Sequence, residues 1–295
     1  MAVVLGLLVA LSYGTGDFFG GLGAKRAPAR TVVLGSFALS ALLLAVVNAG
    51  WVLLGTPPTP AAADLRIGVA VGLIGPISLG LLYRGLATGR MSIVAPITAV
   101  VAAIVPLGWG LATGERPSAV ALAGVAVALI SVGLISSAPA HEDHPEDAPV
   151  PPVSEVLAPA VLSGLGFGTI FILLGAASDH AGLWPLMVSR PVSVVATLAA
   201  TYLVARATGT APGAVLPPRD ALPYVAGAGI LDITANAIYL AATNAGLLSI
   251  VAVLSSLYPA ATVVLARVFL GERLHRLQVV GLAVAVVGVA AMAAG

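Results

Sequence analysis

The chain has 295 residues, of which 59% are hydrophobic and only 8% charged, and its mean hydropathy is +1.09. Soluble domains carry about 25% charged residues, so this chain lacks the charge that a water-facing surface needs, which argues against a soluble enzyme. A net charge of +1 provides no basic surface for nucleic acid, and the absence of cysteine excludes disulfides and thiolate metal sites.

Ten largely uncharged, apolar stretches follow one another along the chain. A bilayer core of about 30 Å requires about 20 apolar residues per helix. The first stretch begins at Ala2 with no basic segment before it, so it is predicted as a membrane span and not as a signal peptide. The sequence therefore predicts an all-α integral membrane protein with ten transmembrane helices, at residues 3–23, 31–54, 66–87, 91–111, 117–137, 155–177, 184–205, 221–243, 247–267 and 276–294.

A polar, proline-rich segment at residues 138–154 separates the fifth predicted helix from the sixth. Two histidines and four carboxylates fall within 141–147, so a metal site is one interpretation. We favour the other, a solvated linker between two membrane-buried halves. The predicted domains are a first repeat at 1–137, this acidic linker at 138–154, and a second repeat at 155–295.

The two halves repeat each other in sequence. At a constant offset of 157 residues, Ser92–Ala95 matches Ser249–Ala252, and Gly114–Arg116 matches Gly271–Arg273. Nearer the start of each half the offset changes by one to three residues, which pairs Asp64 with Asp220 and Tyr83 with Tyr239. Five helices is an odd number, so the second half enters the membrane from the opposite side and the repeats are predicted to be inverted. Inverted repeats are typical of transporters.

Glycines spaced four residues apart predict close contacts between helices, because the absent side chain lets two backbones approach. The pairs are Gly16/Gly20, Gly68/Gly72, Gly85/Gly89 and Gly164/Gly168.

Three charged residues fall inside predicted helices: Asp17, Arg190 and Asp232. A charge at the centre of a membrane helix costs about 2.5–3.5 kcal/mol, so such residues face a cavity or a partner. We predict that all three line one central cavity. Asp232 and Asp17 are interpreted as proton-responsive or cation-binding groups, with a structural role as the alternative. Arg190 either binds a carboxylate or phosphate of the substrate, or pairs permanently with Asp17 or Asp232.

Other polar side chains share helix faces with these charges. Asp232, Asn236, Tyr239 and Thr243 recur at helical spacing on the eighth helix, as do Tyr13 and Asp17 on the first. Ser255, Pro259 and Thr262 are predicted to share one face of the ninth helix. The predicted substrate-binding residues are Tyr13, Asp17, Arg190, Asp232, Asn236, Tyr239, Ser255 and Tyr258. Glu115 and Glu272 precede the fifth and tenth helices and are predicted to cap their N-termini.

The segment Leu257-Tyr258-Pro259 through Leu270–Leu274, followed by Gln278 and Gly281, resembles the closing helices of the EamA repeat in the drug/metabolite transporter superfamily. Ala95-Pro96, Gly114–Arg116 and Gly124 resemble the first copy. The resemblance implies a ten-helix secondary transporter with a central cavity, from a family whose members move amino acids, drugs, nucleotide-linked sugars and other small metabolites. EamA units commonly carry an arginine early in their second helix; Arg190 holds that place in the second half, whereas Ser36 occupies it in the first.

The sequence thus predicts a secondary active transporter in the cell membrane that exports a small metabolite or drug-like compound by alternating access. Its predicted partners are a small-molecule substrate, protons or a counter-substrate, and membrane lipids, with no cofactor, metal or nucleic acid. The alternatives are a non-transporting scaffold or receptor, and an intramembrane enzyme, although the predicted helices contain no Ser/His, HExxH or paired-Asp motif. Ten Lys and Arg residues after odd-numbered helices against two after even-numbered ones place both termini outside, whereas the resemblance implies cytoplasmic termini.

Overall fold

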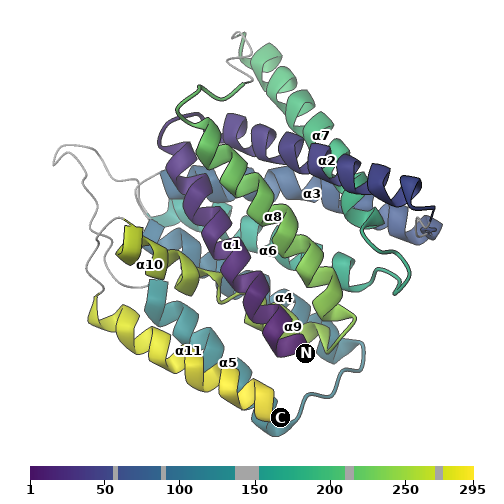
Figure 1. The fold of residues 1–295 in the computed structure, drawn as a ribbon. Helices are drawn as coiled ribbons and strands as arrows, with labels where there is room; N and C mark the ends of the chain where they lie inside the picture. Colours follow the sequence, from purple (N-terminus) through teal and green to yellow (C-terminus); the bar gives the residue numbers. More distant parts are fainter. Residues whose placement is uncertain (56–58, 88–90, 137–152, 210–215, 270–274) are drawn as a thin grey trace, which may run out of the picture.

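The computed structural model describes residues 1–55, 59–87, 91–136, 153–209, 216–269 and 275–295. These residues form eleven α-helices and no β-strand (Figure 1). The helices are α1 (Ala2–Ala24), α2 (Ala29–Leu53), α3 (Ala62–Ala87), α4 (Met91–Ala112), α5 (Ala119–Ser136), α6 (Val153–Gly175), α7 (Trp184–Thr208), α8 (Leu222–Thr243), α9 (Leu248–Ser255), α10 (Tyr258–Phe269) and α11 (Arg276–Ala294).

Each stretch predicted from the sequence as a membrane helix overlaps one or two helices of the structure. Within the described residues, eight helical segments are long and apolar enough to cross a membrane, one of them being α9 and α10 taken together as Leu248–Phe269. Shorter apolar helices lie within α4 at Ile97–Ala112 and within α5 at Ala119–Ile135. The acidic part of the linker, with the histidines considered for a metal, lies outside the described residues.

The ninth predicted helix is broken, which corrects the expectation of one continuous helix over 247–267. α9 ends at Ser255, and α10 begins at Tyr258. Pro259 is the second residue of α10, a position that suits proline because the first turn of a helix needs no N–H donor. The break separates Ser255 from Pro259 and Thr262, so the prediction that these three residues share one helix face is wrong.

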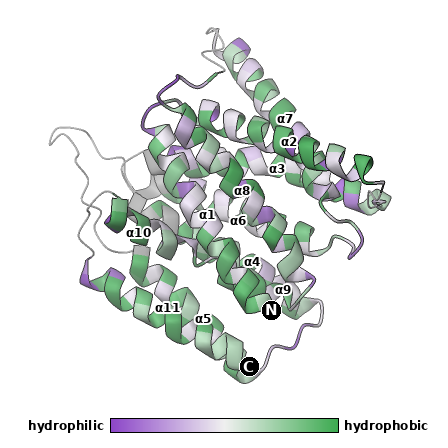
Figure 2. Cartoon of the chain, in the orientation of Figure 1, coloured by the Kyte–Doolittle hydropathy of each residue, from purple (hydrophilic) through white to green (hydrophobic). Residues whose placement is uncertain are grey.

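Apolar side chains cover the outside of the bundle. Leu42, Val204 and Val286 are each more than 60% exposed. Figure 2 shows hydrophobic residues along most helices, whereas hydrophilic residues gather mainly in the connecting segments. Such an outer surface suits contact with lipid.

The helices of the two halves pack against each other in an exchanged order. α1 packs along α8, and α6 packs along α3. α3 also packs on α7, and α8 on α2. α4 packs on α6, whereas α9 and α10 pack on α1. Two further contacts join α2 to α7 and α5 to α11, the latter pair lying side by side in Figure 1.

Glycines bring several of these helices close together, as the GxxxG spacing predicts. An added Cβ at Gly68 or Gly72 would lie 2.7 Å or less from a carbonyl oxygen of α7, and one at Gly164 would lie 2.7 Å from Val101 of α4. Gly89 lies outside the described residues.

Gly72→Ala is expected to lower the melting temperature of the purified protein, because the added methyl group would lie 2.6 Å from the carbonyl oxygen of Ser189. Overpacking of this kind costs about 1–3 kcal/mol. Gly80→Ala, in the same helix, is the matched control: no atom lies within 4 Å of its added methyl group, so the stability should stay the same or rise slightly. Equal melting temperatures for the two variants would contradict tight packing between α3 and α7.

Contacts between helix ends define two sides of the bundle. We call the side where α1 ends, next to Lys25, the Lys25 side. There the Arg26 guanidinium lies 4.3 Å from the centre of the Tyr224 ring at the start of α8. On the side that we call the Glu115 side, Glu115, beyond the end of α4, binds the start of α9. α1 begins on this second side, because a side chain at Gly246 would meet Ala2.

Candidate functional site

A cavity of about 700 Å³ lies among α1, α2, α3, α4, α6, α7, α8 and α10. Six of the eight residues predicted to bind substrate line it: Tyr13, Asp17, Arg190, Asp232, Asn236 and Tyr258. Residues from four separate regions of the sequence therefore meet at one place, as the cost of charge inside a membrane predicts.

Arg190 and Asp232 form an ion pair across this cavity wall. The Nη2 atom of Arg190 lies 2.8 Å from Oδ2 of Asp232, and the side chains are 5% and 28% exposed. Asn236, one helical turn after Asp232, donates from Nδ2 to the other carboxylate oxygen at 3.3 Å and to the Asp232 carbonyl oxygen at 2.8 Å. The Arg190 guanidinium also lies 5.2 Å from the centre of the Phe37 ring. The charge of Arg190 is thus balanced inside the protein, which matches the pairing interpretation with Asp232 as partner.

Asp17 is the third charged residue of the cavity, and it differs from the other two. It lines the cavity from α1, yet it has no ion pair or hydrogen bond to its side chain within the described residues. The lining contains two carboxylates and one guanidinium. With both carboxylates ionised, it therefore carries one net negative charge, and that charge belongs to Asp17.

A further part of the cavity lining is apolar and aromatic. Phe167, Ile170 and Phe171 of α6 line it. Phe171 stacks on Tyr239 with ring centres 4.6 Å apart and lies 6.0 Å from the ring of Tyr13. A ligand in this cavity would therefore meet both charged groups and aromatic surface.

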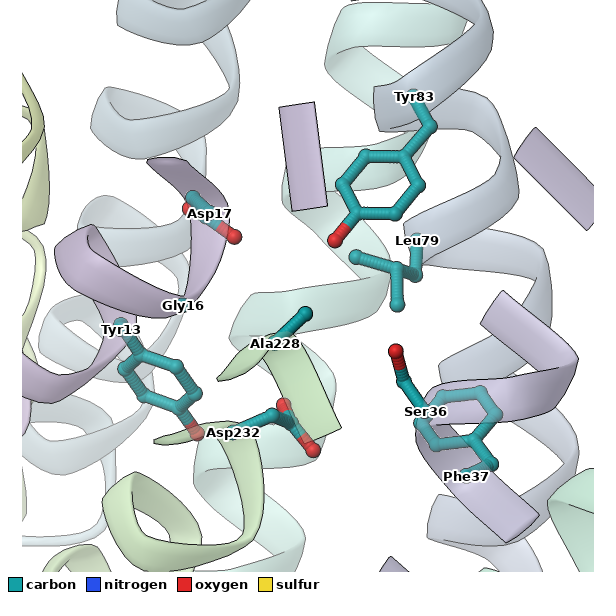
Figure 3. Close-up of a pocket in the computed structure, with 9 residues that line it drawn as sticks. All are labelled: Tyr13, Gly16, Asp17, Ser36, Phe37, Leu79, Tyr83, Ala228 and Asp232. Atoms are coloured by element: carbon teal, nitrogen blue, oxygen red, sulfur yellow. The ribbon is translucent and has the colours of Figure 1, made fainter. Parts of the chain in front are cut away.

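A smaller cavity of about 310 Å³ shares Tyr13, Asp17 and Asp232 with the larger one (Figure 3). In Figure 3 the hydroxyl groups of Ser36 and Tyr83 point toward the space between α1, α2 and α8. Ser36, which stands where the second half has Arg190, donates to the Val225 carbonyl oxygen at 3.2 Å. The smaller cavity is therefore a polar extension of the main one.

Two predicted site residues lie away from the cavity lining. The Tyr239 hydroxyl is fully buried and donates to the Phe171 carbonyl oxygen at 3.3 Å. The Ser255 hydroxyl donates to the Val251 carbonyl oxygen within α9 at 2.7 Å. Thr243, at the end of the polar stripe of α8, likewise donates to its own helix backbone. The stripe reaches the cavity only through Asp232 and Asn236.

Glu115 caps a different helix from the one predicted. Its carboxylate accepts hydrogen bonds from the backbone N–H groups of Leu248 and Ser249, at 2.7 and 3.0 Å. It therefore caps α9 in the other half and not α5, because the fold brings the α4–α5 connection to the start of α9. Glu272 lies outside the described residues.

The aromatic part of the cavity lining was not predicted from the sequence. Phe37 and Phe171 are surrounded in sequence by apolar residues, so they are indistinguishable there from lipid-facing side chains. The repeat does offer one signal: at the register that pairs Tyr13 with Phe167, Asp17 pairs with Phe171. No group of three or more His, Asp or Glu side chains that could hold a metal occurs within the described residues.

Comparisons with known proteins show what the second half of the chain and the whole fold resemble. Residues 156–294 match the EamA-like transporter family. A solved structure described as "Crystal structure of protein" is similar to 98% of this chain and 95% of its own, with a TM-score of 0.71 and 17% sequence identity; this likeness shows the shared fold. The comparison with curated proteins gave no match.

The family match agrees with the sequence and with the helical structure. EamA family members are transporters and not enzymes. Together with the apolar helices of the described regions, the match supports a multi-pass membrane protein. Residues 156–294 thus resemble the EamA-like transporter family in sequence, as the resemblance noted for the closing helices implied.

Proposed function

We propose that this protein is a secondary active transporter of the cell membrane, with ten transmembrane helices in two inverted repeats, which exports a small amphipathic compound by alternating access. The repeats are residues 1–137 and 155–295, joined by the linker at 138–154. Exchange of the two halves' conformations opens the cavity first to one side of the membrane and then to the other.

The exchanged packing of the helices is the observation that carries this proposal. The sequence repeat relates α1 to α6, α2 to α7, α3 to α8, α4 to α9 with α10, and α5 to α11. Under that relation the α1–α8 contact becomes α6–α3, the α3–α7 contact becomes α8–α2, and the α4–α6 contact becomes α9 and α10 on α1, all of which occur. A twofold relation between the halves produces this pattern. With five helices in each half, the axis lies in the membrane plane.

The lining of the cavity favours an amphipathic organic monocation as substrate. Asp17 has no basic partner in the described part of the chain, so a single positive charge would neutralise the site. An anion would have to displace Asp232 from Arg190, which also faces the Phe37 ring. Phe167, Ile170 and Phe171 supply apolar surface for the rest of the molecule. The other predicted site residues have supporting roles, with Tyr13, Asn236 and Tyr258 at the lining and Tyr239 behind Phe171.

The unpaired negative charge of Asp17 also explains why export would be coupled to a proton or a counter-substrate. The site is neutral only when a cation occupies it. The change between the two open conformations therefore costs less free energy with the cation bound, because an unpaired charge is costly in the apolar core. Movement of the empty, ionised site is therefore slow. The substrate leaves on one side, and a proton or a second cation occupies Asp17 for the return.

Reconstituted vesicles test this function. Purified protein in liposomes is expected to take up a labelled amphipathic ammonium compound, and unlabelled compound or a proton gradient on the far side should accelerate that uptake. Stimulation from the far side distinguishes a carrier from a scaffold or receptor, which would bind without moving the compound. Recovery of chemically altered compound would indicate an intramembrane enzyme, and absence of flux across a panel of cations would overturn the proposal.

A further inference from the structure

Two carboxylates of the first half bind the backbone of the second half on the Glu115 side. Asp64, in the first turn of α3, is 1% exposed. Its carboxylate accepts from the Ser178 N–H at 2.9 Å and from the Ser178 hydroxyl at 2.8 Å, between α6 and α7. Glu115 accepts from two N–H groups at the start of α9. We call the bonds of Asp64 to Ser178 and of Glu115 to α9 the closing contacts.

The Glu115 contact joins a charge to N–H groups at the start of a helix. The first N–H groups of a helix have no acceptor inside it, and the helix dipole favours a negative charge there. Gly110 leaves room for the Glu115 carboxylate, since a Cβ at Gly110 would collide with it. Charge-assisted hydrogen bonds are among the stronger ones in proteins. The closing contacts therefore hold the two halves together at this side.

The repeat counterpart of Asp64 is in the opposite condition. Asp220 precedes α8 as Asp64 begins α3, and the sequence repeat pairs them. Asp220 is exposed, and no hydrogen bond or ion pair to its side chain occurs within the described residues. The aspartate at this position of the repeat is thus hydrogen-bonded to the other half on the Glu115 side, as Asp64, and has no such bond on the Lys25 side, as Asp220. A protein that closes one side at a time would have this contact formed on the closed side and absent on the other.

The cavity extends in the direction that this asymmetry predicts. The residues of the smaller cavity include Asp17, Ser36 and Tyr83. All three lie nearer to the helix ends of the Lys25 side, at Ala24, Ala29 and Ala87, than to the opposite ends. On the Glu115 side, by contrast, Ala242 and Ser249 are fully buried. Polar space therefore approaches the side where Asp220 is unbonded.

We infer that Asp64 and Glu115 are positioning residues that hold the Glu115 side closed, and that both closing contacts break when the site turns toward that side. Asp220 then binds the α1–α2 connection on the Lys25 side, as Asp64 binds the α6–α7 connection here. This inference rests on the proposed alternating access and adds the residues that govern it.

Site-specific labelling tests the inference, and the chain is suited to it because it contains no cysteine. Ala242→Cys reports on the Glu115 side and Ser36→Cys on the Lys25 side. Each is combined with Asp64→Asn/Glu115→Gln, which removes the charge of both closing contacts. Labelling by a polar maleimide is measured on purified full-length protein in detergent, where the reagent reaches both sides. We expect Cys labelling at 242 to become about tenfold faster or more, and labelling at 36 to become slower.

The reciprocal change separates positioning from loosened structure. If labelling becomes faster at both positions, the substitutions have only loosened the bundle and the inference fails. The inference also fails if the rate of labelling at position 242 is unchanged. Asp220→Asn is the matched control, and it should leave labelling at 242 no faster than in the parent. Labelling requires no substrate, so reciprocal labelling without flux in vesicles would contradict the proposed function and leave this inference standing.

Discussion

Replacing Arg190 with methionine is expected to destabilise the folded protein by about 3 kcal/mol or more, because it leaves the Asp232 carboxylate without its partner. Breaking one half of a buried ion pair typically costs about 3–5 kcal/mol. The lower end applies here, since Asp232 is 28% exposed to the cavity and Asn236 still donates to it. Methionine fills similar space, so the loss reports on charge. Thermal or denaturant unfolding in detergent measures it.

The double variant Arg190→Met/Asp232→Asn is expected to recover most of that stability. With both charges removed, no uncompensated ion remains, and a neutral pair is often as stable as a buried ion pair. Asp232→Asn alone should fold, because the Arg190 guanidinium keeps an amide oxygen as acceptor and remains over the Phe37 ring. Independent, additive losses from the two substitutions would show that the residues are not coupled, and would contradict the pair as a unit.

Transport by these variants separates stability from function. Under the proposed mechanism, Asp232→Asn leaves a folded protein whose cavity has lost one negative charge, so that its lining is neutral instead of carrying one net negative charge. A cation should therefore bind less well, and transport should be lost or uncoupled from its driving gradient. Unchanged rate and unchanged coupling in Asp232→Asn would remove Asp232 from the transport mechanism and leave it a structural role only.

The sequence was most informative about where helices lie, because apolar length is a local property. The break between α9 and α10 was not foreseen, since Pro259 in an apolar stretch is compatible with either a kinked helix or a new helix. Sequence predicted the charges of the cavity for a general reason: Asp17, Arg190 and Asp232 are too costly to face lipid. Which two of them would pair depended on tertiary geometry.

Contacts between distant segments account for the errors. Glu115 was expected to cap the helix that follows it, because helix capping is usually local; its partners are instead more than a hundred residues away, at Leu248 and Ser249. Tyr239 lies on the predicted face of α8, but Phe171 covers it. Periodicity indicates which face of a helix looks inward, yet it carries no information about which neighbouring side chain comes between that face and the cavity.

Asp17→Asn is expected to weaken binding of an amphipathic monocation by about thirtyfold or more while the protein remains folded. Asparagine has the same shape as aspartate but no charge, and removing one member of a desolvated charge pair costs about 2 kcal/mol or more. Since the Asp17 side chain has no ion pair or hydrogen bond within the described residues, no internal partner is stranded by the change. Stability should therefore stay near that of the parent, in contrast to Arg190→Met.

Ligand-induced stabilisation provides the measurement for Asp17. A compound that binds only the folded state raises the melting temperature in proportion to its occupancy, so the parent should be stabilised by an alkylammonium compound but not by a neutral molecule of the same shape. Asp17→Asn should lose the first response, and Asp17→Glu, which keeps the charge, should retain part of it. If the neutral molecule stabilises the parent equally well, or if Asp17→Asn responds as the parent does, the aromatic wall and not the carboxylate selects the substrate, and the substrate need not be a cation.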